Sequence, residues 1–166
     1  MKLEHTRFGT LNFDASAAIS FPSGIIGFAE ESSFLLIERE HGPLAYLQSL
    51  RTPALALPVI ETAGPGSPYT IDDAVAPADA IGCDPRHLVI LNVVFVEGAD
   101  GVLCANQLSP IAIDAERRRG AQIILDPERF STSTPIGKVA DAPSAPAPFA
   151  NANDGAEYAM AAGSSR

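Results

Sequence analysis

The stretch Phe21-Pro22-Ser23-Gly24-Ile25-Ile26-Gly27-Phe28 decides how the first part of this chain folds. It places two glycines three residues apart among four large apolar side chains. Because glycine adopts positive φ angles and lets another segment of backbone come close, this spacing predicts a fixed bend with buried apolar side chains. No titratable side chain lies between the two phenylalanines. The bend therefore favours a shape-defining element of a binding protein over part of an active site.

Strand patterns lie on both sides of this bend, whereas helix signals are rare. Apolar and β-branched runs separated by glycine or proline predict about eight short strands, with turns about every 8–12 residues. One or two helical turns are predicted over residues 77–83, where a proline opens an alanine-rich run, and Asp72-Asp73 before it is interpreted as a solvated turn. This pattern predicts an all-β sandwich or small barrel. The strand patterns fall at residues 2–6, 11–14, 34–37, 44–50, 54–60, 87–96, 102–106, 111–114 and 121–125.

The composition divides the chain of 166 residues into a folded domain and a tail. Residues 1–137 carry the strand patterns and form the predicted domain. Residues 138–166 contain ten alanines and three prolines but few large apolar side chains. Such a segment buries too little apolar surface to offset the entropy lost on ordering, so a disordered tail is predicted.

Charge and targeting signals exclude several classes of protein. The net charge is −9, and residues 1–137 hold nine basic and 17 acidic groups. An acidic body repels nucleic acid and favours basic partners, although solubility alone also explains it. The N-terminus lacks the apolar run of a signal peptide, and apolar runs such as residues 88–95 are too short to span a membrane. A cytoplasmic protein without direct membrane or nucleic-acid contact is predicted.

No convergent set of catalytic or metal-ligating residues is apparent. His5, His41 and His87 are interpreted as surface or edge histidines, because a general base must meet a partner in space. Cys83 and His87 are four residues apart, but a zinc site needs three or four ligands. Cys83 and Cys104 are therefore predicted to be small buried thiols. The sequence predicts no enzyme activity, no metal and no cofactor.

Arg117-Arg118-Arg119-Gly120 is the one basic cluster, and it lies between two predicted strands. Asp114 and Glu116 stand beside it and partly neutralise it. No aromatic residues interleave with these arginines as base stacking would require. A solvated hairpin turn or a partner contact is favoured, and contact with RNA or DNA is the alternative.

Four motifs together resemble the flagellar assembly factor FliW family over residues 2–136. The first is the bend at residues 21–28, and the second is Tyr46-Leu47-Gln48-Ser49. The third is Leu91-Asn92 followed by Asn106-Gln107-Leu108-Ser109-Pro110-Ile111. The fourth is the basic turn with Gly120-Ala121-Gln122 and the apolar strand after it. The resemblance implies a compact, antiparallel β-barrel-like fold with one or two short helices.

The resemblance also implies a protein that binds two partners in a mutually exclusive way and transforms neither. One is flagellin, bound at its terminal helical region, and the other is the translational repressor CsrA. When flagellin accumulates it captures the FliW-like protein, and free CsrA then silences flagellin mRNA. The candidate partner contacts are Gly24, Ile25, Gly27, Phe28, Asn106, Leu108, Pro110 and Arg118.

Three alternatives remain open from the sequence. The chain is a flagellin-specific chaperone without CsrA antagonism, an enzyme with an unnoticed cleft, or a nucleic-acid-binding barrel that uses residues 117–119. For Phe21, Ile25 and Phe28 of the bend, a structural role in the core is favoured over partner contact, because large apolar residues are usually buried.

Overall fold

The fold is taken from a computed structural model that describes residues 1–39, 42–62 and 66–138. His41 and residues 139–166 of the predicted tail lie outside these ranges. The described residues form one α-helix, α1 (Ile71–Ile81), and two 3-10 helices at Ala15–Ala17 and Pro85–His87. They also form eleven strands: β1 (Lys2–Thr6), β2 (Gly9–Asn12), β3 (Ile19–Ser20), β4 (Ser33–Glu38), β5 (Leu44–Ser49), β6 (Ala56–Glu61), β7 (Leu88–Glu97), β8 (Val102–Ala105), β9 (Ile111–Asp114), β10 (Arg119–Gln122) and β11 (Thr134–Lys138).

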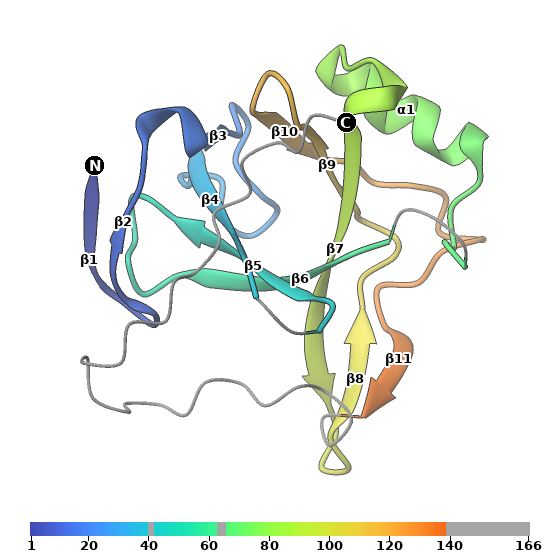
Figure 1. The fold of residues 1–166 in the computed structure, drawn as a ribbon. Coiled ribbons are helices and arrows are strands. Elements are labelled where there is room, and N and C mark those ends of the chain that lie inside the picture. The colour runs from blue at the N-terminus through green and yellow to red at the C-terminus, as the bar shows by residue number, and fades with distance from the viewer. Residues whose placement is uncertain (40–41, 63–65, 139–166) are drawn as a thin grey trace.

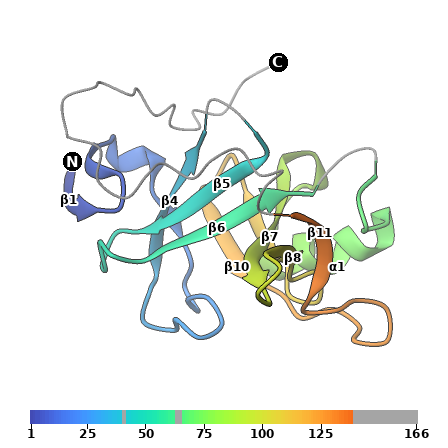
Figure 2. The same cartoon turned by 90° about the horizontal axis from the view of Figure 1, so that it is seen from below.

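Seven strands close into a barrel in the order β3-β4-β5-β6-β7-β9-β10. Neighbours are antiparallel except at the seam, where β10 and β3 run parallel and the Ser20 amide donates to the Arg118 carbonyl at 2.9 Å. The ten-residue β7 pairs first with β9 and then with β8. Its far end therefore projects from the barrel with β8 and β11 beside it (Figure 1). This arrangement confirms the predicted all-β, barrel-like fold, which Figure 2 shows from below.

Alternation along each barrel strand separates an inner core from outer ones. In β9, Ile111 and Ile113 point into the barrel, whereas Ala112 packs outside against Ile81 and Cys83 at the end of α1. The inner core consists of Ile19, Phe21, Ile25, Phe34, Leu47, Val59, Leu91, Ile111 and Ile113. Because the barrel interior is filled by these side chains, it is a packed core and not a channel.

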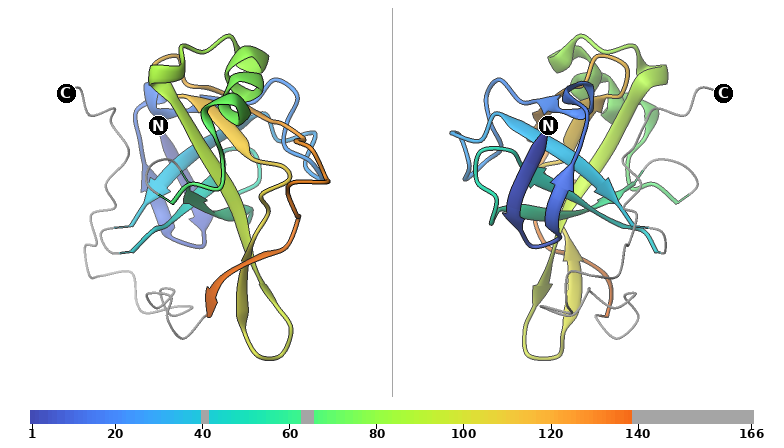
Figure 3. Two further views of the ribbon diagram at one scale, coloured as in Figure 1. Left: turned by 90° about the vertical axis from the view of Figure 1, so that its right-hand side faces the viewer. Right: turned by 60° about the vertical axis from the view of Figure 1, so that its left-hand side comes forward.

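The β1–β2 hairpin covers a second face of the barrel (Figure 3, right). Its Leu11 packs with Leu35 and Ile37 of β4 and with Tyr46 of β5. Arg7 in the hairpin turn lies over the Tyr46 ring, 4.9 Å from its centroid. The strands predicted at residues 2–6 and 11–14 thus form a hairpin that covers an outer apolar cluster.

The predicted helix at residues 77–83 was wrong in its start. Helix α1 begins at Ile71, because Thr70 and Asp73 form a capping box: the Thr70 hydroxyl accepts from the Asp73 amide, and Asp73 accepts from the Thr70 amide. Pro77 lies inside the helix and does not open it. Asp73 is buried and pairs with Arg129 at 2.6 Å, so the interpretation of Asp72-Asp73 as a solvated turn was also wrong.

Two strands have no counterpart in the prediction, and β2 and β10 each begin two residues earlier than predicted. Strand β3 has only two residues, and β11 contains Pro135 and Gly137, which disfavour a strand except at an edge. Strand β11 pairs with β8 alone among the described strands. Strand β10 covers Arg119–Gln122, two residues earlier than predicted, because Gly120 and Ala121 pair opposite Ile113 and Ala112.

Candidate partner-binding groove

Two consecutive tight turns form the bend at residues 21–28. The Gly24 amide donates to the Phe21 carbonyl at 2.9 Å, closing a turn with Pro22 at its second position. The Phe28 amide then donates to the Ile25 carbonyl at 2.7 Å, and Gly27 has φ +84° at the third position of this turn. A positive φ there is typical of a type II turn. Figure 2 shows the β3–β4 connection, in blue, extending beyond the strands.

Gly24 is required because the two turns lie directly against each other. Its φ is +67°, and a Cβ at this position would lie 2.6 Å from the Ala29 carbonyl oxygen and 2.7 Å from the Ala29 Cα. Both atoms belong to the backbone, so no side-chain rotation would relieve the contact. The predicted close approach of a second backbone segment is therefore confirmed at Gly24.

The bend is anchored on the barrel at both ends. At its start, the Phe21 ring packs edge-on against Phe34, with centroids 5.3 Å apart, and lies directly over Gly120. At its end, the buried Glu31 carboxylate accepts hydrogen bonds from the Ser49 hydroxyl and, at 2.6 Å, from the Thr52 hydroxyl. Burial acts to raise the pKa of Glu31, but these hydrogen bonds outweigh it and hold the pKa below its usual value.

Residues 106–110 form a second rigid loop beside the bend. The Asn106 side-chain oxygen accepts from the Ser109 amide at 3.0 Å, and the Asn106 carbonyl accepts from the buried Asn92 amide group at 2.6 Å. Asn92 also donates to the Tyr69 hydroxyl, which in turn donates to the Gln107 carbonyl at 2.9 Å. Burial raises the pKa of Tyr69 to about 12, so this hydroxyl keeps its proton at any physiological pH.

Between the bend and this loop lies a groove of about 130 Å³. Its floor consists of Leu57 and Val93, which pack against the inner core and mark the mouth of the barrel. Ile26 and Phe28 stand on its rim with 56% and 39% of their surfaces exposed. The full lining is Ile25, Ile26, Phe28, Leu57, Val93, Asn106, Ser109 and Gln122. An apolar floor with a few polar groups at its edge is typical of a binding site.

Gln122 joins the two walls of the groove. Its side-chain oxygen accepts from the Ile26 amide at 2.8 Å, and its side-chain nitrogen donates to the Ser109 carbonyl at 2.9 Å. Gln122 lies two residues after Gly120 on β10, so both face the barrel interior. One side chain therefore connects the tip of the bend to the loop at residues 106–110.

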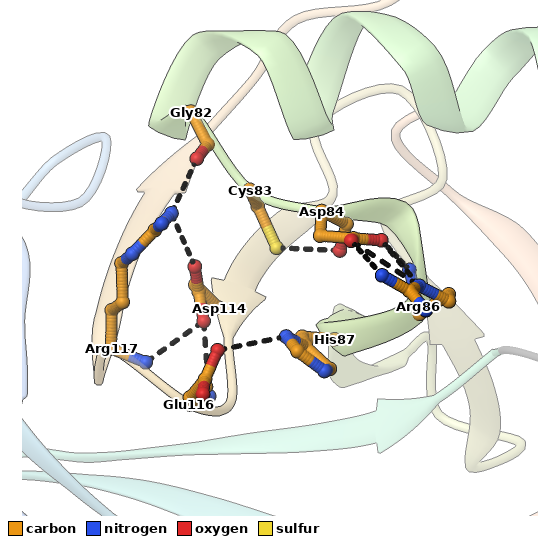
Figure 4. Close-up of polar contacts among 8 residues, drawn as sticks. All are labelled: Gly82, Cys83, Asp84, Arg86, His87, Asp114, Glu116 and Arg117. Carbon is orange, nitrogen blue, oxygen red and sulfur yellow. Dashed lines mark hydrogen bonds and ion pairs between the residues drawn. The ribbon is translucent and has the colours of Figure 1, made fainter.

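The basic turn between β9 and β10 is tied down by its neighbours (Figure 4). The buried Asp114 carboxylate accepts from the Arg117 amide at 2.8 Å, and the Arg117 guanidinium donates to the Gly82 carbonyl at 2.7 Å. His87 faces Glu116 at 3.0 Å rather than Cys83. Burial and the adjacent Asp114 charge raise the pKa of the Cys83 thiol to about 11. Arg117 therefore links the turn to the end of α1, although the side chains of Arg117 and Arg119 are exposed.

Comparison with known proteins places this architecture in a family. The sequence model of the FliW protein family matches residues 2–136. The chain belongs to the FliW family. A flagellar assembly factor FliW from Caldanaerobacter subterraneus subsp. tengcongensis is 35% identical over 140 residues, covering 82% of this chain and 93% of the relative. One from Natranaerobius thermophilus is 32% identical over 139 residues, covering 82% and 92%.

The solved structures agree with the sequence comparison. A crystal structure of a flagellar assembly factor FliW superimposes with a TM-score of 0.68 and 27% identity, covering 81% of this chain and 96% of that one. The predicted resemblance to FliW is therefore confirmed, and the barrel has the fold of a flagellar assembly factor family.

The candidate contacts predicted from FliW motifs are only partly brought together. Ile25, Phe28 and Asn106 line the groove, although Ile25 is otherwise buried in the inner core. Gly24 and Gly27 shape the bend without lining the groove, and Leu108 and Pro110 belong to the facing loop. Arg118 lies before the start of β10, whereas Gln122 at its end lines the groove. Arg118 has φ 52°, and its carbonyl closes the barrel seam.

Sequence reasoning missed five lining residues of this groove: Ile26, Leu57, Val93, Ser109 and Gln122. Leu57 and Val93 lie at inward-facing positions of their strands. The alternating pattern of a strand predicts that such positions are buried, but it does not show which of them lie at the open end of the barrel. Gln122 was visible as part of the basic-turn motif, but its partner Ile26 is 96 residues away.

In the part of the chain that the structure describes, no group of three histidine, cysteine or acidic side chains is placed to hold a metal ion. Within the same residues, no helix is both long and apolar enough to cross a membrane.

Proposed function

We propose that this chain is a cytoplasmic flagellar assembly factor that captures flagellin in the groove and, when free of flagellin, antagonises CsrA. It acts by binding and not by turnover, and it couples the flagellin level to translation of flagellin mRNA. One observation carries the proposal: Ile26 and Phe28 expose apolar surface on a rigid rim above an apolar floor. Exposed apolar side chains grouped beside a groove and rimmed by polar residues are typical of an interaction site.

The terminal segments of flagellin suit this groove because they are amphipathic and remain unassembled in the cytoplasm. An amphipathic helix binds by placing successive apolar side chains into a groove. A volume of about 130 Å³ accommodates one branched apolar side chain, with Ile26 and Phe28 contacting its neighbours. Asn106 at the edge would face polar groups of the same helix.

The acidic body suits the second partner. CsrA binds RNA and is expected to present basic surface, to which a protein with a net charge of −9 is steered. Once docked, the same negative field disfavours phosphates nearby. Because each partner lowers the amount of free protein available to the other, flagellin and CsrA are coupled by mass action.

The rival proposal is a chaperone that binds flagellin alone. Mixing the purified protein with flagellin, with CsrA, and with CsrA bound to RNA, followed by size exclusion, separates the two. Binding of both proteins, with flagellin displacing CsrA, is expected. Binding of flagellin alone selects the chaperone. RNA binding without CsrA selects the nucleic-acid-binding barrel, and binding of none overturns the proposal and reopens the enzyme alternative.

A matched pair of variants tests the site. Ile26→Asp puts a charge on the groove rim, and Val96→Asp makes the same kind of change at an equally open position, 54% exposed, on the projecting end of β7. We expect Ile26→Asp to weaken flagellin binding at least tenfold and Val96→Asp to leave it within twofold. Equal effects of the two variants on flagellin binding would refute the claim that flagellin binds in the groove. CsrA binding that is unchanged at 1 M salt would remove the electrostatic part of the proposal.

A further inference from the structure

We propose that Gln122 is a positioning residue that holds the groove in its binding-ready shape. The inference rests on the proposed function for what the groove binds, but not for how the groove is held. Its basis is the pair of hydrogen bonds that one carboxamide makes across the groove, to the Ile26 amide and to the Ser109 carbonyl. Gln122 thus sets the separation of the two walls.

Each wall of the groove is rigid by itself. What can still change is the position of one wall relative to the other. The bend is anchored through Phe21 and Glu31 at its two ends and through the buried Ile25, but Ile26 at its tip is exposed, and its amide bonds to Gln122. The facing loop is held through Asn92 and Asn106 from below. The Gln122 carboxamide is the side chain in the described residues that bonds to both walls.

The chemistry of the carboxamide explains why glutamine is suited to this position. The Ile26 amide offers a donor and the Ser109 carbonyl an acceptor, so the bridging group must accept on one side and donate on the other. A carboxamide does both, whereas a carboxylate only accepts. Asparagine has the same group on a side chain one methylene shorter, which cannot span the same two walls from the same backbone position. A preformed groove binds more tightly because less ordering is needed on binding.

Three variants separate the two bonds. Gln122→Met keeps the length and removes both bonds, and Gln122→Glu keeps the acceptor for Ile26 but loses the donor to Ser109. Gln107→Met is the matched control: it is the same change in the neighbouring loop, at a side chain that makes none of the described hydrogen bonds and does not line the groove.

Hydrogen exchange of the Ile26 amide measures how well its hydrogen bond to Gln122 protects it, and the measurement needs no partner protein. We call the two Gln122 hydrogen bonds the clamp. We expect Gln122→Met to speed this exchange at least tenfold, while Gln122→Glu and Gln107→Met leave it within threefold. Xenon-induced NMR shifts of the Leu57 and Val93 methyl groups report on the shape of the groove. Both Gln122 variants should change these shifts. Unaltered exchange and unaltered xenon shifts in Gln122→Met would overturn the clamp.

Binding then shows whether the clamp matters to function. A peptide with the sequence of a flagellin terminal helical segment should bind both Gln122 variants about tenfold more weakly than the wild-type protein, and should bind Gln107→Met normally. Loss of the Ile26 protection with unchanged peptide affinity would refute the positioning role. If the wild-type protein itself fails to bind the peptide, the proposed partner is wrong, and exchange and xenon shifts still decide the clamp.

Discussion

Replacing the two glycines of the bend one at a time should separate backbone strain from crowding. Gly24 and Gly27 both have positive φ angles, +67° and +84°. A Cβ on Gly27 would meet no atom within 4 Å, whereas a Cβ on Gly24 would lie 2.6 Å from the Ala29 carbonyl oxygen and 2.7 Å from that of Phe28. The two alanine substitutions therefore share the conformational cost and differ in the steric one.

The magnitudes follow from this difference. A left-handed conformation costs a non-glycine residue about 1–2 kcal/mol, and restriction of the unfolded chain returns about 0.4–1 kcal/mol. Gly27→Ala should therefore destabilise the protein by about 1 kcal/mol. Gly24→Ala carries an additional cost of about 1–3 kcal/mol, because the Ala29 backbone must move away from the new Cβ. Its total should be about 2–4 kcal/mol.

Urea unfolding followed by circular dichroism measures both variants on the same scale. At about 4 °C per kcal/mol for a chain of this size, melting temperatures should fall by about 4 °C for Gly27→Ala and by about 10 °C for Gly24→Ala. The slope of unfolding free energy against urea should stay unchanged, since the folded surface is the same. Equal losses in the two variants would refute the argument that Gly24 is fixed by backbone crowding.

Three further outcomes follow from the described contacts. The Arg129 guanidinium and the two Thr70 hydrogen bonds hold the pKa of Asp73 down at about 2. The Asp73 carboxylate therefore stabilises the fold above pH 4, and this stabilisation is lost as the pH falls from about 4 toward 2. In Asp73→Asn, the melting temperature should depend less on pH over this range. The thiol of Cys83, with its pKa raised to about 11, should resist Ellman's reagent at pH 8 until urea unfolds the chain. Truncation after Gly137 should lower the melting temperature by less than about 4 °C if the predicted tail is disordered.

The strands were predictable where a strand has one face inside the barrel and one outside. In β9 the alternation of Ile111, Ala112 and Ile113 matches the inner and outer cores directly. Strand β11 was not predictable, because Pro135 and Gly137 suppress the strand signal and only pairing with β8 fixes it. Helix α1 was misplaced because Pro77, a strong start signal, outweighed the less visible capping box at Thr70.

The bend was predictable as a bend, but its exposure was not. Four apolar side chains in eight residues favour burial, and Phe21 and Ile25 are indeed in the inner core. Ile26 and Phe28 point outward because the type II turn reverses the chain between Ile25 and Phe28. The two successive turns therefore decide which side chains of the bend face inward. The order of residue types alone does not predict which ones are buried.

The four family motifs, which are far apart in the sequence, all support the same groove. Gly120 of the basic-turn motif provides the space that the Phe21 ring fills, and Gln122 of the same motif holds Ile26. Ser49 of the second motif holds Glu31 at the end of the bend, just as Asn92 of the third holds Asn106 in the facing loop. Several of these motif residues are buried polar groups, whose hydrogen bonds orient loops more than they add stability. A motif set devoted to placing two loops across a barrel mouth is what a protein needs when its function depends on the shape of that mouth.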